Sequence, residues 1–288
     1  MRNCLTIDLE SISHRYLTER RYLSEAGRRV VDVEKNRRAL DSDFLLSSTR
    51  KMLQAIRRHG HAVTFFVVGE VYEWYPALVQ EIKEMGHEVA HHSHTHFPID
   101  TRVSLRKELQ KSGKFLLTFR PKGFRAPRAS VSRECAAELA NHGFVYDSSS
   151  YGPFRDSRLV SGVIEVPIST YGPRSGSHLT LPRPLSFALL RNCEIPFGSG
   201  YFIALLSSIS PSLVSYFIKK SNKKGFPAIL SLHPWQLYEG HISSLLKWGP
   251  SRLGILPYDF SCHRAFEHLL RSHNFCTVFE LLETMNIL

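Results

Sequence analysis

The sequence AVTFFVVGEVYEWYPALVQEIKEMGHEVA, residues 62–90, passes from the pattern of a strand to that of a helix and back. Ala62–Val68 is rich in β-branched and aromatic residues, as buried strands are. Pro76–Met85 has helical apolar spacing, begins with proline and is followed by Gly86, a common helix stop. Glu88–Ala90 begins another strand. A strand, a helix and a strand with short joins predict one unit of a parallel sheet.

The same alternation extends in both directions along the chain. Further strands are predicted at Leu5–Asp8, Gly123–Arg125, Phe144–Asp147 and Ala228–Leu232, and helices at Leu45–His59, Arg102–Leu117, Ser132–His142, Ser212–Lys224 and Ser261–His273. Their number favours an α/β barrel over a small open sheet. We expect Ser13–Arg38 to be a loop or exposed helical insertion, and residues 150–200 to form loops and short antiparallel strands over the mouth. Because no repeat or linker interrupts the chain, one domain over residues 1–288 is expected.

The chain is basic, with 37 Lys and Arg against 26 Asp and Glu and a net charge of +11 over 288 residues. Such a surface attracts anions. The basic residues occur mainly in pairs and match no zinc-finger, RRM or helix-turn-helix signature. We therefore expect a solvated basic face rather than a nucleic-acid site.

Compartment signals are few. Five cysteines, odd in number and without a CxxC pair, suit a reducing compartment. The N-terminus lacks the apolar stretch of a signal peptide, and the longest apolar run, Tyr201–Leu206, is far shorter than the roughly 20 residues of a membrane span. We expect a cytoplasmic protein without a transmembrane segment. Peripheral membrane contact and homo-oligomerisation stay open.

Five histidines lie within the ten residues from His87 to His96. His92 and His96 are separated by four positions, which lets two imidazoles converge on one ion across a helical turn or tight loop. His87 and His91 share this spacing. A divalent metal site is favoured over solvated histidines, and imidazole suits zinc and other late divalent metals.

A catalytic zinc normally has three protein ligands, so the histidine pair needs a third. Asp8 and Glu10 follow the first strand and are two residues apart, so an extended chain would direct both to the same side. Three later strand ends also carry polar groups, namely Arg125, Asp147 and His233. Acidic, basic and imidazole groups at successive strand ends are the arrangement of a barrel active site.

Six motifs in this order resemble the polysaccharide deacetylases with a NodB-homology domain, carbohydrate esterase family 4. The motifs are LTIDLE at 5–10, TFFVVGEV at 64–71, GHEVAHHSHTH at 86–96, GFRAPR at 123–128, YDSSSY at 146–151 and LSLHPWQ at 230–236. The chain is most similar to the cytoplasmic, exopolysaccharide-associated branch with a His-Pro-Trp motif. The resemblance extends from Leu5 to about Glu283 and implies a distorted (β/α) barrel of about seven strands.

The resemblance also implies roles for the polar residues. Asp8 would be the general base, and Glu10, His92 and His96 would bind the metal. Arg125 would orient Asp8, Asp147 would support that charged network, and His233 would be the general acid. The backbone amide of Arg128 would stabilise an oxyanion. His91 and His94 have no role in the pattern and are expected in the second shell or at the surface.

Two departures from the family pattern stand out. The usual adjacent aspartates are replaced by Asp8-Leu9-Glu10, which makes the carboxylate ligand less certain. Arg128-Ala129 replaces a small or aromatic residue followed by glycine or serine, which is expected to alter substrate preference.

The expected activity is metal-dependent removal of an N-acetyl group from an amino sugar in a polysaccharide, a glycolipid or a nucleotide-sugar precursor. The metal would be zinc, cobalt, iron or manganese, and the saccharide would be carried on phosphate. Two alternatives stay open: hydrolysis of a small non-sugar amide, as in allantoinase-like relatives of the fold, and non-catalytic carbohydrate binding.

Overall fold

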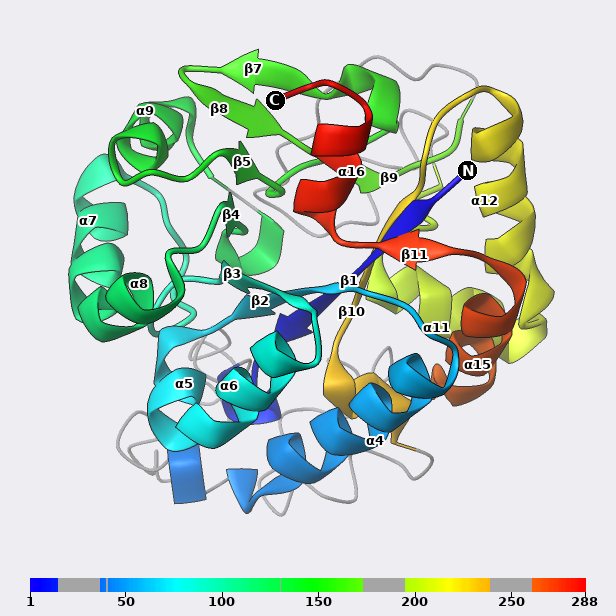
Figure 1. Ribbon diagram of the computed structural model, residues 1–288, viewed down its shortest axis with the longest axis horizontal. Coiled ribbons are helices and arrows are strands. Elements are labelled where there is room, and N and C mark those ends of the chain that lie inside the picture. The colour runs from blue at the N-terminus through cyan, green and yellow to red at the C-terminus, as the bar shows by residue number, and fades with distance from the viewer. Residues whose placement is uncertain (15–36, 40, 130, 173–194, 239–260) are drawn as a thin grey trace, which may run out of the picture.

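The computed structural model describes residues 1–14, 37–39, 41–129, 131–172, 195–238 and 261–288 (Figure 1). Most of the predicted insertion Ser13–Arg38, and residues 173–194 of the predicted mouth region, lie outside the described residues.

A curled sheet forms the centre of the fold, in the order β10-β1-β2-β3-β4-β5-β8-β7 with β11 beside β1. The strands are β1 Asn3–Leu9, β2 Thr64–Val67, β3 Glu88–His91, β4 Gly123–Phe124, β5 Tyr146–Asp147, β7 Arg158–Val160, β8 Val163–Glu165, β10 Ile229–Leu232 and β11 Phe275–Cys276. Only the β7–β8 pair among them is antiparallel. The parallel series from β10 to β8 has seven strands, which confirms the predicted barrel-type α/β sheet.

Helices surround this sheet on the outside (Figure 1). They are α4 Phe44–Arg58, α5 Gly69–Trp74, α6 Pro76–Glu84, α7 Arg102–Lys111, α8 Gly113–Phe119, α9 Arg133–Asn141, α11 Gly200–Ile209, α12 Ser212–Lys223, α15 His263–Ser272 and α16 Val278–Thr284. The prediction of one helix over Arg102–Leu117 is wrong. The helix breaks at Ser112, whose hydroxyl lies 2.8 Å from Nε2 of the buried His91. The short elements α5, α11, β11 and α16 were not predicted.

Alternate residues of β1 face opposite layers. Leu5, Ile7 and Leu9 belong to the large apolar core that includes buried residues of α4, α6 and α15. Thr6 and Asp8 face the barrel interior, where both accept hydrogen bonds from the Arg125 guanidinium. This period of two separates the stabilising layer from the polar layer.

Hydrogen bonds of Gly198 connect the two ends of the curled sheet. The strands β6 Tyr151–Gly152 and β9 Ile168–Ser169 pair in parallel just beyond β5 and β8. Gly198 N–H donates to Ser169 O at 2.9 Å, and Ser231 N–H of β10 donates to Gly198 O at 2.7 Å. The prediction of antiparallel strands over the mouth holds for β7 with β8 and is wrong for β6 with β9, because these continue two strands that are already parallel.

Gly198→Ala is expected to destabilise the fold by about 1–3 kcal/mol or more, the usual cost of overpacking a buried site. A Cβ atom at Gly198 would lie 2.4 Å from Ile229 O and 2.8 Å from Ser169 N, both backbone atoms. Gly113→Ala is the matched control, since a Cβ there has nothing within 4 Å. Urea unfolding of both variants tests the prediction, which fails if the two have equal stability.

Candidate active site

The parallel strands bring the predicted polar residues to one rim of the sheet. Pairing of Asp8 with Phe66, of Phe66 with Ala90 and of Ile7 with Leu232 aligns the carboxyl ends of β1, β2, β3 and β10. Four polar residues each follow the last residue of a strand: Glu10 after β1, His92 after β3, Arg125 after β4 and His233 after β10. Asp8 is the penultimate residue of β1. This is the rim at which (β/α) barrels place their active sites.

Glu10, His92 and His96 form a buried cluster with the composition of a metal site. Ligand atoms of the three lie within 4.8 Å of one another. His92 Nε2 is 3.8 Å from Glu10 Oε2, and His96 Nε2 contacts the same oxygen. Among the described residues, none offers Oε2 a donor with hydrogen-bond geometry. Two imidazoles and a carboxylate that meet around one point fit a zinc-type ion.

The tautomer of His92 suits a metal ligand. Its Nδ1 lies 2.8 Å from Arg125 O, which can only accept, so we assign the proton to Nδ1 and the lone pair to Nε2. Burial is the largest influence on the ring and lowers its pKa to about 4. The imidazole is therefore neutral at neutral pH, and Nε2 faces Glu10. A hydrogen bond from the second ring nitrogen is usual in metal-binding histidines.

His92 and His96 are presented by a tight loop in which two non-glycine residues are left-handed, Ser93 at φ 60° and His96 at φ 62°. Such backbone persists only where the surroundings hold it. The buried carboxylate of Glu108 accepts from His94 N–H at 3.0 Å, Thr95 N–H at 2.6 Å and Thr95 Oγ at 2.9 Å. Glu108 thus fixes the loop from behind.

Glu108→Ala is expected to weaken metal binding by roughly 10- to 100-fold, as the loss of outer-shell support for metal ligands does. The change leaves two buried backbone N–H groups unpaired and releases the loop. Glu138→Ala is the control. Glu138 is also buried, but its Oε1 pairs with Arg106 Nε at a distance of 2.7 Å and does not contact the histidine loop. Metal titration by calorimetry would contradict this role if both variants bound metal like the wild type.

Asp8 is held as an ionised carboxylate. Burial favours its neutral form, but the charges of Arg125, His92 and His233 outweigh burial and lower its pKa. Arg125 Nη1 donates to Oδ1 at 2.6 Å, and Ser231 Oγ donates to Oδ2 at 3.0 Å. The Arg125 guanidinium is in turn fixed by Ser148 and lies 4.0 Å from the ring centre of Phe66. Asp8 is therefore oriented and charged before any substrate arrives.

His233 lies beside both carboxylates. Its Nδ1–H donates to Gln236 Oε1 at 3.0 Å, and its Nε2 is 3.2 Å from Glu10 Oε1 and 3.9 Å from Asp8 Oδ2. Burial opposes a charge on the ring, but Glu10 and Asp8 outweigh it and raise the pKa of His233. The ring stacks on Trp235 at 4.6 Å. Asp8 and His233 are thus neighbours on adjacent strands, with Glu10 between His233 and the two metal-site histidines.

Asp147 contacts the charged network only indirectly. Its Oδ1 accepts from Ser149 Oγ at 2.5 Å, and that hydroxyl accepts from Ala126 N–H at 2.7 Å. Burial, then the nearby Glu165 carboxylate, raises the pKa of Asp147. The connection to Arg125 therefore runs through the backbone of the next residue.

The Arg128 amide lies in an unusual turn. Arg128 and Ala129 both have left-handed backbone, at φ 61° and 48°, directly after Pro127. The Ala129 N–H is committed to Ala126 O at 3.0 Å. The turn thus places two residues with unfavourable φ beside the site. Strained backbone often occurs at functional positions.

The remaining histidines of the cluster lie outside the metal site. His91 Nε2 and His94 Nδ1 lie 2.8 and 3.2 Å from the Ser112 hydroxyl, and burial lowers the pKa of His91 to about 3. His87 packs against Phe65 and is also held neutral by burial, with its pKa lowered to about 4. His87 and His91 have the same four-residue spacing as His92 and His96, but in the structure they do not form part of the metal cluster.

A second group of residues near His96 was not predicted, and of these His14 and Arg37 are buried. His14 stacks on Trp74 at 4.9 Å and lies 6.1 Å from the His96 ring. Its Nε2 is 3.2 Å from Glu70 Oε2, which Arg37 also contacts. Glu70 lies in the TFFVVGEV motif, but nothing in the sequence marks its contact with His14 and Arg37, which approach from other parts of the chain.

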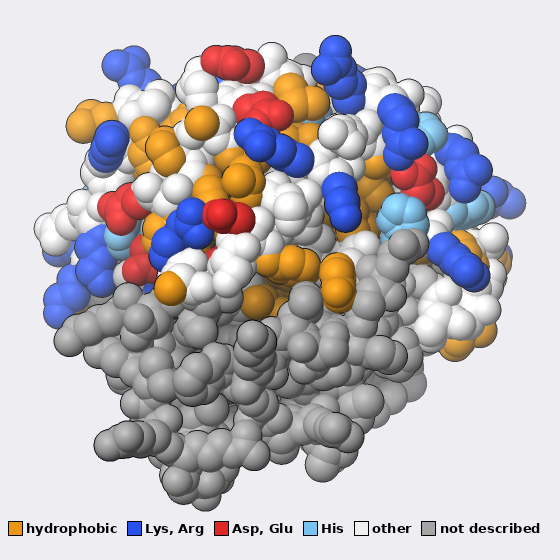
Figure 2. All heavy atoms as spheres, turned by 90° about the horizontal axis from the view of Figure 1, so that it is seen from below, with side chains coloured by type: hydrophobic (Ala, Val, Ile, Leu, Met, Phe, Trp, Pro, Cys, Tyr) orange, Lys and Arg blue, Asp and Glu red, His pale blue; other side chains and the backbone are white. Residues whose placement is uncertain are grey.

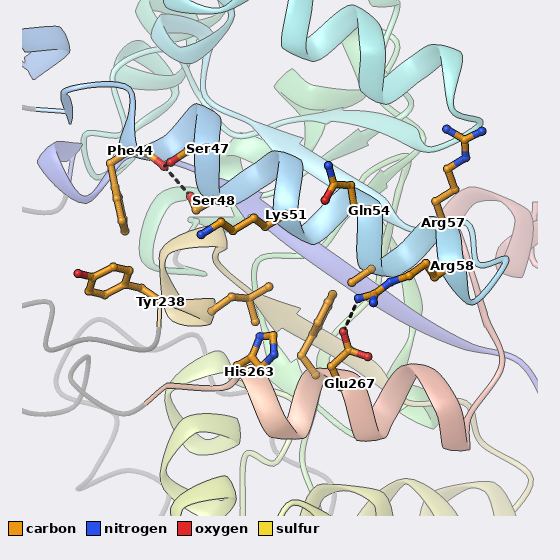
Figure 3. A pocket seen from close by; sticks show the side chains of 13 residues that line it. Phe44, Ser47, Ser48, Lys51, Gln54, Arg57, Arg58, Tyr238, His263 and Glu267 are labelled. Carbon is orange, nitrogen blue, oxygen red and sulfur yellow. Dashed lines mark hydrogen bonds and ion pairs between the residues drawn. The ribbon is translucent and has the colours of Figure 1, made fainter.

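A surface groove of about 1050 Å³ lies between α4, α15 and the turn Pro234–Leu237. Figure 3 shows Lys51 pointing toward it and Arg58 paired with Glu267 at its edge. On this side of the molecule, Figure 2 shows Lys and Arg side chains among fewer Asp and Glu over the described part. No residue of the metal cluster lines the groove.

Comparison with known proteins agrees with this geometry. Residues 39–146, which include both metal-site histidines and Arg125, match the family described as polysaccharide deacetylase. This part of the chain is similar to the polysaccharide deacetylase family. Its narrower likeness to the cytoplasmic branch with a His-Pro-Trp motif stays a prediction.

The individual proteins that the chain resembles are distant in sequence. The peptidoglycan deacetylase-like protein FGM2 of Gibberella zeae is 24% identical over 73% of this chain and 60% of its own length. The peptidoglycan-N-acetylmuramic acid deacetylase PdaC of Bacillus subtilis is 31% identical over 32% of this chain and 21% of its own length. The chain thus spans less than two thirds of either curated relative.

A solved structure supports the fold over the whole chain. A crystal structure assigned as a polysaccharide deacetylase of Mycobacterium smegmatis matches with a TM-score of 0.59 and 17% identity, over 99% of this chain and 91% of that one. At this identity the match shows the fold alone.

Proposed function

We propose that the protein is a metal-dependent N-deacetylase that hydrolyses the acetamide of an N-acetylated amino sugar. The observation that carries the proposal is the Glu10–His92–His96 cluster beside an ionised Asp8 and beside His233, whose pKa the two carboxylates raise. The match of residues 39–146 to the polysaccharide deacetylase family supports deacetylation of an acetylated amino sugar.

The chain's own residues supply the proton transfers of such a reaction. A bound divalent ion would lower the pKa of a water toward about 7 and polarise the acetyl carbonyl. Asp8 is the base: Oδ1 is occupied by Arg125, so Oδ2, which faces Ser231 and His233, takes the water proton. His233 donates its Nε2 proton to the leaving amine, which is too basic to depart unprotonated.

The substrate we propose is a saccharide joined to a phosphate carrier, either nucleotide or lipid. The net charge of +11 supports an anionic carrier. The free, buried state of Cys4, Cys135, Cys262 and Cys276 supports our proposal of a cytoplasmic location.

Acetate release tests the activity. The metal-loaded protein is incubated with N-acetylhexosamine oligosaccharides, N-acetylated nucleotide sugars and allantoin, and loss of an acetyl group is followed by mass spectrometry. We expect acetate and a free amine from at least one N-acetylated sugar. Turnover of allantoin alone would indicate the small-amide alternative, and turnover of none with full metal content would indicate a carbohydrate-binding protein.

His233→Ala is expected to lower kcat on the acetamide by roughly 10²- to 10⁴-fold, the usual range for a lost general acid. Metal content should be retained, because His233 contacts the metal cluster only through Glu10. An activated acetyl ester should lose much less activity, since its leaving group departs without a proton. Parallel kinetics on both substrates test this, and equal losses would assign His233 to positioning instead.

A further inference from the structure

The helices α11 and α12 form a bent pair with an unusual composition. From Ile195 to Tyr238 the sequence contains no acidic residue, and α11 contains no charged residue of either sign. No single described helix is long and apolar enough to cross a bilayer. Taken together, α11 and α12 have the length and apolar composition of a membrane span. They are bent by 120° at their junction.

Each helix buries one face and exposes another. Ile203, Val214 and Ile218 are fully buried in the large apolar core, so this side of the pair belongs to the protein. On the other side Ile209 is 74% exposed and Leu205 is 38% exposed. Leu205 and Ile209 are four residues apart on α11, so they lie on the same side of that helix.

The exposed and half-buried residues of α12 include an aromatic ring and three lysines. Tyr216 is 51% exposed, and Lys220 Nζ lies 5.4 Å from its ring centre. Lys219 and Lys223 are also exposed. Within the described part of the chain, no carboxylate lies within ion-pair distance of these three lysines.

We propose that Leu205, Ile209, Tyr216 and the three lysines form a docking surface for an anionic lipid bilayer. A bilayer interface offers an apolar layer for Ile209 and Leu205 and negative headgroups for the lysines at the same time. A second copy of the chain fits less well, since a twofold contact would bring two sets of lysines together without any acidic partner.

The docking surface is attached directly to the candidate active site. α11 begins at Gly200, where a Cβ atom would lie 2.8 Å from Ser231 O and 2.5 Å from Gln236 Oε1. Ser231 and Gln236 are the residues that hold Asp8 and His233. Ten residues of α-helix span roughly 15 Å, so docking through Ile209 brings the site close to the headgroups.

Co-sedimentation with vesicles tests the proposal. Full-length protein is mixed with vesicles of phosphatidylcholine alone or with phosphatidylglycerol added. We expect binding to the anionic vesicles that weakens as salt rises. The partition coefficient should fall by about 100-fold in the triple variant Lys219→Gln, Lys220→Gln, Lys223→Gln, because each lysine contributes about fivefold to membrane binding. Leu205→Ser with Ile209→Ser should lower it by at least about tenfold.

The control replaces two exposed leucines elsewhere on the surface. Leu117 and Leu159 are 80% and 71% exposed, on α8 and β7, and Leu117→Ser with Leu159→Ser should bind vesicles like the wild type. Absence of wild-type binding, or equal losses in control and test variants, would overturn the proposal. If sedimentation velocity instead shows a dimer that Ile209→Ser dissociates, the surface joins two copies. Binding is measured without substrate, so it can fail while the proposed deacetylase activity stands.

Discussion

Asp8→Asn is expected to lower kcat by about 10³- to 10⁴-fold while metal affinity stays within a few-fold of the wild type. An amide cannot accept the water proton, whereas its size keeps the contacts with Arg125 and Ser231 in place. The ionised state of Asp8 in the folded protein, held by Arg125, is the reason for expecting a base at this position.

Metal titration and acetate release, measured on the same preparation, decide between base and ligand for Asp8. Ser231→Ala is the companion variant, since it removes one hydrogen bond to Oδ2 but keeps the carboxylate, and it should retain most of the activity. If Asp8→Asn loses the metal, Asp8 is a ligand and another base must be sought.

Glu10→Ala is expected to weaken metal binding by about 100-fold or more, because even outer-shell losses cost 10- to 100-fold. Activity should fall with occupancy. Glu10 supplies the only carboxylate oxygen within reach of both His92 Nε2 and His96 Nε2 in the described part of the structure.

The control for Glu10 is Glu73→Ala. Glu73 is an exposed carboxylate 3.9 Å from His94, near the histidine loop but outside the metal cluster, so its loss should leave metal affinity unchanged. Calorimetric titration of both variants tests the assignment. Wild-type affinity in Glu10→Ala would show that the third ligand is a different residue.

Strand ends made the site predictable from sequence. Asp8, Glu10, His92, Arg125 and His233 each follow or end a strand whose apolar pattern is clear, and parallel pairing then places them together. The expected extended path from Asp8 to Glu10 differs from the structure, since Glu10 N–H turns back to Asp8 O at 3.0 Å. Glu10 reaches the histidines from this turn.

Long-range contacts explain what sequence reasoning missed. Glu108 lies on a helix that has no motif, and its role depends on where α7 meets the histidine loop. Position 198 requires glycine because the backbones of Ser169 and Ile229 leave no space for a Cβ atom, and no local sequence pattern reveals such a contact. The family resemblance implied that Asp147 supports the charged network, but its carboxylate accepts a hydrogen bond from Ser149 and reaches Arg125 only indirectly.

The most direct test of the proposed function measures metal content and acetate release together in the wild type and in the His92→Ala, His96→Ala double variant. The predicted result is about one divalent ion per wild-type chain with acetate released from an N-acetylated sugar, and neither metal nor acetate in the double variant. Full metal content in the double variant, or deacetylation by a metal-free wild type, would contradict it.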